Sequence, residues 1–181
     1  MKEKIGIIIF PIFCLLFSLL ILRTDPNFTF LLLKNPDALQ PTKQLLSYFD
    51  NNAEMPSIFT MQEKAHLIDV GKLLNSAYYV LGVLAAILIY CAGNNWKPII
   101  QKGTILLMIL LAVMFFVQFD TFFTQFHQIF FPQGNWQFPP DSTLIQFYPA
   151  SFFMNYGIAI AIHALITAIF LNYSEIVSRK G

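Results

Sequence analysis

Four long apolar runs, nearly free of charge, constrain the fold of this chain more than any other feature. Three of them contain no charged residue, and the fourth is interrupted only by His163. Each run is close to the roughly 20 residues that a helix needs to cross the hydrocarbon core of a bilayer. The sequence therefore predicts four transmembrane helices, at about residues 5–23, 73–93, 103–119 and 156–172.

The composition agrees with a membrane location. Hydrophobic residues make up 56% of the 181 and charged residues only 12%, whereas soluble domains carry about 25% charge. We predict an all-α integral membrane protein with a single membrane domain over residues 1–181. Two long segments, 24–72 and 120–155, connect the spans, and we expect them to form an extracellular cap with short interfacial helices.

Lysine and arginine indicate the orientation, because cytoplasmic loops of membrane proteins are enriched in both. The short segments 1–4, 94–102 and 172–181 are rich in these cations, whereas the two long segments hold few for their length. The cations of the short segments are Lys2, Lys4, Lys97, Lys102, Arg179 and Lys180. Both termini are thus expected in the cytoplasm and both long segments outside.

Two classes of function are disfavoured by cysteine and charge. Cys14 and Cys91 both lie within apolar runs and form no C-x-x-C pair, which argues against thiol–disulfide exchange. The net charge is only +1 and the cations are not clustered, so nucleic acid is not an expected partner.

A histidine flanked by two carboxylates lies just before the second span. Thr60 and Glu63 have the spacing of a capping box, so a helix is predicted to begin there and to continue into the membrane. Glu63, His66 and Asp69 then follow at intervals of three, which puts one carboxylate about a turn to each side of the imidazole. Such a carboxylate raises the basicity of a histidine that acts as a general base, although ordinary surface charges on a solvated helix would have the same spacing.

The second long segment carries His127 among five phenylalanines. Burial there would depress the pKa of His127 and keep the imidazole neutral, and the alternative is an interfacial histidine whose ring is partly hydrated. His163 differs because it lies within a span, and we expect it to make a structural hydrogen bond between helices.

The remainder of this segment reads as turns and a short helix. Residues 119–131 are apolar enough to lie in the lipid interface, and residues 132–135 indicate a turn. Asp141 follows two prolines and is predicted to cap a helix over residues 142–148, a role that we favour over catalysis.

Familiar catalytic motifs are missing from the sequence. There is no G-x-S-x-G elbow, no H-E-x-x-H helix and no P-loop. Histidine acid–base chemistry without a protein nucleophile, metal or other cofactor is the simplest expectation. Two alternatives remain open: a metal-dependent membrane hydrolase that uses His66, His127 and nearby carboxylates, and a scaffold without enzymatic activity.

Three blocks of residues resemble the lipoprotein intramolecular transacylase family of Gram-positive bacteria. They are Glu63 to Val70, Phe126 to Phe131, and Asn135 to Phe138 together with Asp141 to Pro149. The resemblance extends over the four spans and both connecting segments. It implies an enzyme of the bacterial cell membrane, with its active site outside, whose substrate is a diacylglyceryl-modified lipoprotein.

The resemblance also implies a reaction and roles for residues. The sn-2 acyl chain of the lipoprotein would move to the α-amino group of its own N-terminal cysteine, which gives the lyso-form. His66 and His127 would divide the acid and base roles, with Glu63 or Asp69 supporting His66. Asn135 and Trp136 are candidates for stabilising the oxyanion, although Trp136 is equally well explained as an interfacial anchor. Tyr148 is a weaker candidate for a supporting role in the site. Membrane lipid is an expected partner of the protein.

Overall fold

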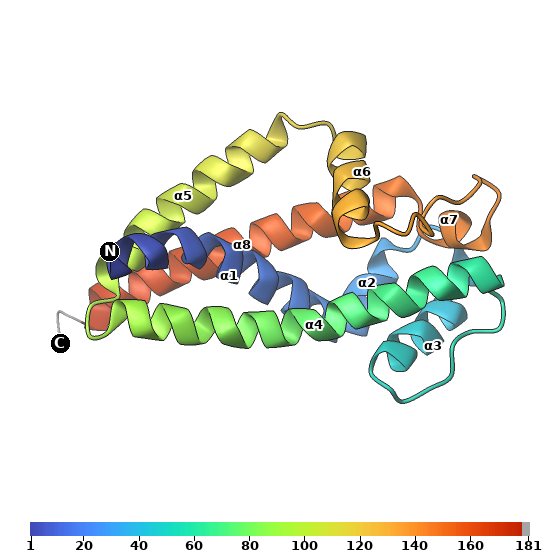
Figure 1. Cartoon of the computed structure of the whole chain (residues 1–181), viewed down its shortest axis with the longest axis horizontal. Coiled ribbons are helices and arrows are strands. Elements are labelled where there is room, and N and C mark those ends of the chain that lie inside the picture. The colour runs from blue at the N-terminus through green and yellow to red at the C-terminus, as the bar shows by residue number, and fades with distance from the viewer. Residues whose placement is uncertain (179–181) are drawn as a thin grey trace. The chain divides into compact units, whose positions relative to one another are not determined.

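The computed structural model describes residues 1–178, with side chains through Ser174, so Arg179 and Lys180 lie outside the described residues. Every regular element within this range is helical, and Figure 1 labels the α-helices. The elements are α1 (Lys2–Thr24), α2 (Pro26–Leu32), the 3₁₀ helix η1 (Pro36–Ala38), α3 (Leu39–Phe49), α4 (Met61–Ala92), α5 (Lys97–Phe115), α6 (Phe119–Phe130), α7 (Thr143–Phe147) and α8 (Ala150–Ser178).

Four of these helices are long and apolar enough to cross a membrane, which confirms the four predicted spans. They are α1, α4, α5 and α8. The third predicted span, residues 103–119, is displaced towards the C-terminus relative to α5, which begins at Lys97 and ends at Phe115. Gln118 has an extended backbone and precedes α6. Helix α4 begins at Met61, after Thr60, as the capping box predicted.

The chain divides into two compact units. The span unit comprises residues 1–21, 77–117 and 158–181, and the loop unit comprises residues 22–76 and 118–157. The first three turns of α4 carry four charged residues, so the apolar part of this helix begins at Leu73. His66 and Asp69 therefore lie before the membrane-spanning part and belong to the loop unit.

Small and apolar side chains hold the span unit together. Its core includes Phe10 of α1, Leu107 of α5 and Ala164 of α8. At Gly103 a Cβ atom would lie 2.7 Å from the ring of Phe10, so the close approach of α1 and α5 requires glycine there. Polar bonds between helices, which are favourable where water is scarce, add to this packing.

His163 makes one of these bonds. Its Nδ1 lies 2.9 Å from the Ser18 hydroxyl, which joins α8 to α1 and confirms the predicted structural contact. The Asn172 amide donates to the Thr104 hydroxyl at 2.6 Å and joins α8 to α5.

The loop unit has its own apolar core, built from α3, α4, α7 and the beginning of α8. Its buried members include Leu45, Leu67, Leu144 and Phe152. A buried pair of hydroxyls, Thr42 and Tyr148 at 2.7 Å, adds a polar link between α3 and the end of α7. The core thus fixes the first turns of α4, which carry His66, against α3 and α7.

Helix α7 is capped by Ser142 and not by the predicted Asp141. The Ser142 side chain accepts a hydrogen bond from the Ile145 amide at 3.4 Å. Its own amide bonds back to the Pro139 carbonyl at 3.0 Å, and this turn holds Asp141 one position before the cap. Asp141 is exposed, so the proline pair shifts the helix start by one residue.

Candidate active site in the loop unit

Two imidazoles from distant parts of the sequence meet in the loop unit. His66 of α4 and His127 of α6 have ring centroids 5.9 Å apart, and their exposed fractions are 6% and 9%. Aromatic rings surround the pair, and Phe131 contacts both, at 4.8 Å from His66 and 5.5 Å from His127. The two predicted catalytic histidines therefore share one dry, aromatic environment.

The ring of His127 is held by its own helix. Its Nδ1 lies 2.8 Å from the carbonyl oxygen of Phe123, one turn earlier in α6. A carbonyl oxygen only accepts hydrogen bonds, so Nδ1 is the protonated nitrogen and Nε2 carries the lone pair. The Phe123 ring also packs against the imidazole in a tilted arrangement, with centroids 4.0 Å apart. His127 therefore has a defined tautomer with Nε2 available as a base.

Burial keeps both imidazoles neutral. Desolvation, helped by the nearby His127, lowers the pKa of His66 to about 4, against weaker opposing effects of Asn135 and Asp69. Desolvation also lowers the pKa of His127, although its bond to Phe123 opposes the shift. Near pH 7 each ring can accept a proton.

Asp69 does not bond directly to His66. Its Oδ2 accepts hydrogen bonds from the amides of Asn135, at 2.9 Å, and Gln133, at 2.8 Å. Its Oδ1 lies 3.2 Å from the Lys72 ammonium. These donors, Asn135 first, lower the pKa of Asp69, so the carboxylate is ionised and its charge raises the pKa of His66.

Glu63 has a structural environment that differs from the predicted one. It is 1% exposed, and its two oxygens accept the backbone amides of Thr60 and Leu144, each at 2.7 Å. The Thr60 hydroxyl accepts the Glu63 amide at 3.3 Å, which completes the predicted capping box. Glu63 thus joins the start of α4 to α7 and has no hydrogen bond to His66.

The remaining candidates are divided between the site and its surroundings. Trp136 lies against His127, with centroids 4.9 Å apart, and is partly exposed. Asn135 reaches the site through Asp69. Tyr148 is bonded to Thr42, and burial raises its pKa to about 12, so its hydroxyl stays protonated. Asp141 lies exposed in the turn before α7.

Sequence reasoning missed several residues of the site. Phe131 and Phe138 contact His66, and Gln133 holds Asp69 across 64 residues of sequence. Phe123 is four residues before His127, so the helical spacing of α6 was a usable signal for that contact. No local pattern connects Gln133 with Asp69.

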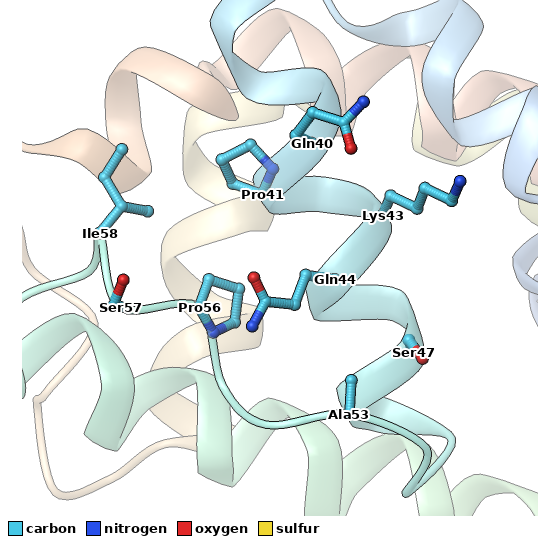
Figure 2. A pocket seen from close by; sticks show the side chains of 9 residues that line it. All are labelled: Gln40, Pro41, Lys43, Gln44, Ser47, Ala53, Pro56, Ser57 and Ile58. Carbon is cyan, nitrogen blue, oxygen red and sulfur yellow. The ribbon is translucent and has the colours of Figure 1, made fainter.

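Metal ligands are not gathered in the described part of the chain. Within it, no group of three or more His, Cys, Asp or Glu side chains is placed to hold a metal ion. A groove of about 470 Å³ lies between α3 and residues 53–58 (Figure 2). Lys43 is the one ionisable residue in its lining, and both histidines lie outside that lining, so the groove is separate from the histidine pair.

Solved structures share this fold. The membrane integral lipoprotein intramolecular transacylase Lit from Bacillus cereus is similar over 98% of this chain and 97% of that one, with a TM-score of 0.69 and 19% identity. A histidine-to-alanine variant of the same protein matches over 98% and 94%, with a TM-score of 0.67 and 19% identity. At this identity the likeness establishes the four-span fold.

Sequence comparisons give the family. An uncharacterized protein from Aquifex aeolicus (strain VF5) is 27% identical to this chain over 128 residues. The match covers 67% of this chain and 58% of that protein, which is less than two thirds of the relative's length. A family model described as "Lipoprotein intramolecular transacylase Lit" matches residues 4–153, well over half of the chain. This chain therefore belongs to the Lit family of lipoprotein intramolecular transacylases.

Proposed function

We propose that this protein transfers the sn-2 acyl chain of a diacylglyceryl lipoprotein to the α-amino group of the same lipoprotein's N-terminal cysteine. The observation that carries the proposal is the pair of buried, neutral imidazoles of His66 and His127, 5.9 Å apart. Membership of the family supplies the reaction class, and the pair supplies the acid–base groups that an acyl transfer to an amine requires.

The proposed step moves two bonds and one proton. The amine nitrogen attacks the sn-2 ester carbonyl, and the nitrogen gives up a proton to an imidazole as the C–N bond forms. The C–O bond to glycerol then breaks, and the imidazolium returns the proton to the departing glyceryl oxygen. The products are an amide and a free hydroxyl, so no water, cofactor or covalent enzyme intermediate is consumed or formed.

We assign the base role to Nε2 of His127 and the partner role to His66. The bond from His127 Nδ1 to the Phe123 carbonyl supports this, because it leaves Nε2 with its lone pair. Repulsion from His127 helps to lower the pKa of His66, so the pair favours holding a single proton at a time. A single shared proton suits a reaction in which one proton leaves nitrogen and reaches oxygen.

Positioning contributes the remainder of the proposed catalysis. Ester and amine belong to one substrate molecule, so the protein has only to hold a folded-back conformer. Such orientation supplies as much as roughly 7–11 kcal/mol of the barrier in model reactions. Trp136 and Phe138 are the partly exposed rings over His127 and His66, and we assign them to the wall against which the substrate's glyceryl ester lies.

We also infer that both termini are cytoplasmic and that the loop unit faces outward. The support is the distribution of cations, with Lys2, Lys4, Lys97 and Lys102 in the short segments. An outward loop unit would meet lipoproteins after their export.

The test is an assay with purified protein and a diacylglyceryl-cysteine peptide that has a free α-amino group. Mass spectrometry is expected to show unchanged mass, with fragments that place one acyl chain on nitrogen. His66→Ala and His127→Ala should reduce the rate by about 10²-fold or more, the usual contribution of acid–base groups. His163→Ala, which removes a histidine from the span unit, is the matched control and should retain the reaction.

Other products would point elsewhere. Release of a free fatty acid, abolished by a chelator, would indicate the metal-dependent hydrolase. An unmodified peptide with the wild-type protein would contradict the proposed reaction, as would full activity in both single-histidine variants.

A further inference from the structure

The Asp69 carboxylate fixes the orientation of the Asn135 amide. The Nδ2 group of Asn135 donates to Oδ2 of Asp69 at 2.9 Å, and the same oxygen accepts the Gln133 amide at 2.8 Å. A carboxylate only accepts hydrogen bonds, so the reverse orientation of Asn135 would place two acceptors in contact. The nitrogen end of the amide therefore points to Asp69 and the oxygen end points away from it.

The oxygen end of this amide and one nitrogen of His66 form a complementary pair. Oδ1 of Asn135 and Nδ1 of His66 are both buried, and neither atom has a hydrogen-bond partner in the described part of the chain. Asn135 acts on the imidazole, because its side chain raises the pKa of His66 against the effect of burial. A buried acceptor and a buried ring nitrogen without partners are each destabilising, and a proton on the nitrogen would allow the two to satisfy each other.

We propose that Asp69 and Asn135 act in series as positioning residues for His66: Asp69 holds the amide, and Oδ1 of Asn135 accepts the Nδ1 proton. His66 is then fixed in the tautomer with the lone pair on Nε2. Asn135 thus takes a place different from the oxyanion contact expected from the sequence. The structural part of this proposal is independent of the reaction, whereas its catalytic consequence rests on the proposed transacylation.

The two histidines would then be prepared in the same way by different means. His127 donates its Nδ1 proton to the backbone oxygen of Phe123, and His66 donates its own to the side-chain oxygen of Asn135. Each ring would then present an unprotonated Nε2 to the reacting groups. A proton accepted by His127 could be passed to His66. At metal sites, removal of the outer contact that fixes the tautomer of a histidine changes affinity or activity by about 10–100-fold, and we expect an effect of similar size for His66.

The charged and titratable groups around His66 come from two elements. Asp69 lies on its own helix and raises the pKa of His66, while His127 on α6 lowers it. Lys72 forms an ion pair with Asp69, and it is not among the groups that shift the pKa of His66. Removal of the Asn135 amide should therefore lower the pKa of His66 further, because one of the two groups that raise it is lost.

The experiment is ¹⁵N NMR of histidine-labelled full-length protein in detergent micelles, with the His66 signals assigned by their loss in His66→Gln. In the wild type at pH 7 we expect Nδ1 to be protonated and Nε2 to be unprotonated. In Asn135→Leu the ring should shift towards the Nε2-protonated form, with kcat lower by about tenfold or more and KM changed less. Gln137→Leu, an exposed glutamine two residues along, should leave the tautomer and kcat unchanged.

The outcomes separate this proposal from the proposed reaction. A protonated Nε2 of His66 in the wild type, or an unchanged tautomer in folded Asn135→Leu, would overturn the positioning role. An inactive wild-type protein that shows the expected tautomer would count against the transacylation and support the positioning. If Asn135→Leu does not fold, the wild-type spectrum alone still decides the tautomer.

Discussion

His66 couples the candidate site to stability, because its pKa differs between the folded and unfolded chain. Burial holds the pKa of His66 at about 4 in the folded protein, whereas an exposed histidine titrates near 6.5. Between these values the unfolded chain binds a proton that the folded chain does not, and proton binding stabilises the state that binds it. Stability due to His66 is therefore full above about pH 6.5 and is lost as the pH falls towards 4.

The loss should be measurable as thermal unfolding in detergent at pH values from 7 to 4. We expect the wild type to lose up to about 3 kcal/mol more than His66→Gln over this range, because the pKa of His66 is about 4 in the folded protein and near 6.5 in the unfolded chain. The comparison between the two proteins removes the contribution of carboxylates, which titrate in both. Parallel curves for the two proteins would show that His66 is not desolvated in the folded state.

At the scale of the element, α7 is anchored by one buried side chain of α4. Glu63 accepts the Leu144 amide near the start of α7, and Ser142 caps the same helix. A helix of five residues has little stability of its own, so these contacts and the apolar core hold it in place. The carboxylate expected to serve His66 instead joins two helices.

Substitutions at Glu63 and Asp141 compare the buried side chain that anchors α7 with an exposed residue that lies just before the same helix. Glu63→Ala should destabilise the protein by about 2–4 kcal/mol, because two backbone amides lose their acceptor. Asp141→Ala should change the free energy of unfolding by less than about 0.5 kcal/mol, since Asp141 is exposed and makes no cap. Detergent-phase unfolding curves measure both.

The conservative variant Glu63→Gln keeps an oxygen acceptor and is expected to retain kcat in its folded fraction. A large fall in kcat for well-folded Glu63→Gln would instead indicate that Glu63 takes part in catalysis.

At the scale of the whole molecule, the proposed topology makes the two long segments accessible from one side of the membrane. Both native cysteines lie in the helices α1 and α4, and neither is in a connecting segment. A cysteine introduced at an exposed position therefore reports the side on which that position lies. Gln128 of α6 and Asn94 between α4 and α5 are both exposed.

Labelling of intact cells with a membrane-impermeant maleimide provides the measurement. Gln128→Cys is expected to react at once, and Asn94→Cys only after the membrane is permeabilised. The parent protein without either substitution controls for the native thiols. The opposite pattern would invert the orientation and place the candidate site on the cytoplasmic side.

Local pattern was sufficient for the existence of the four spans and for the start of α4. Charge-free runs of about 20 residues have one stable solution in a bilayer, so the four spans followed from hydropathy. The capping box at Thr60 and Glu63 placed the start of α4, because its two hydrogen bonds lie within four consecutive residues. The prediction from local pattern was wrong at Asp141. A turn closed by the bond from the Ser142 amide to the Pro139 carbonyl makes Ser142 the cap of α7.

The partners of the candidate residues were decided only by the tertiary structure. His66 meets His127 across 61 residues of sequence, and Asp69 meets Asn135 across 66. Such pairs depend on how α4, α6 and the following turn pack, and helical spacing within α4 carries no information about that packing. The sequence alone therefore determined a four-span membrane protein with one histidine in each of its two long connecting segments. Long-range packing decided that His66 lies beside His127, that Asp69 accepts the Asn135 amide, and that Glu63 accepts two backbone amides.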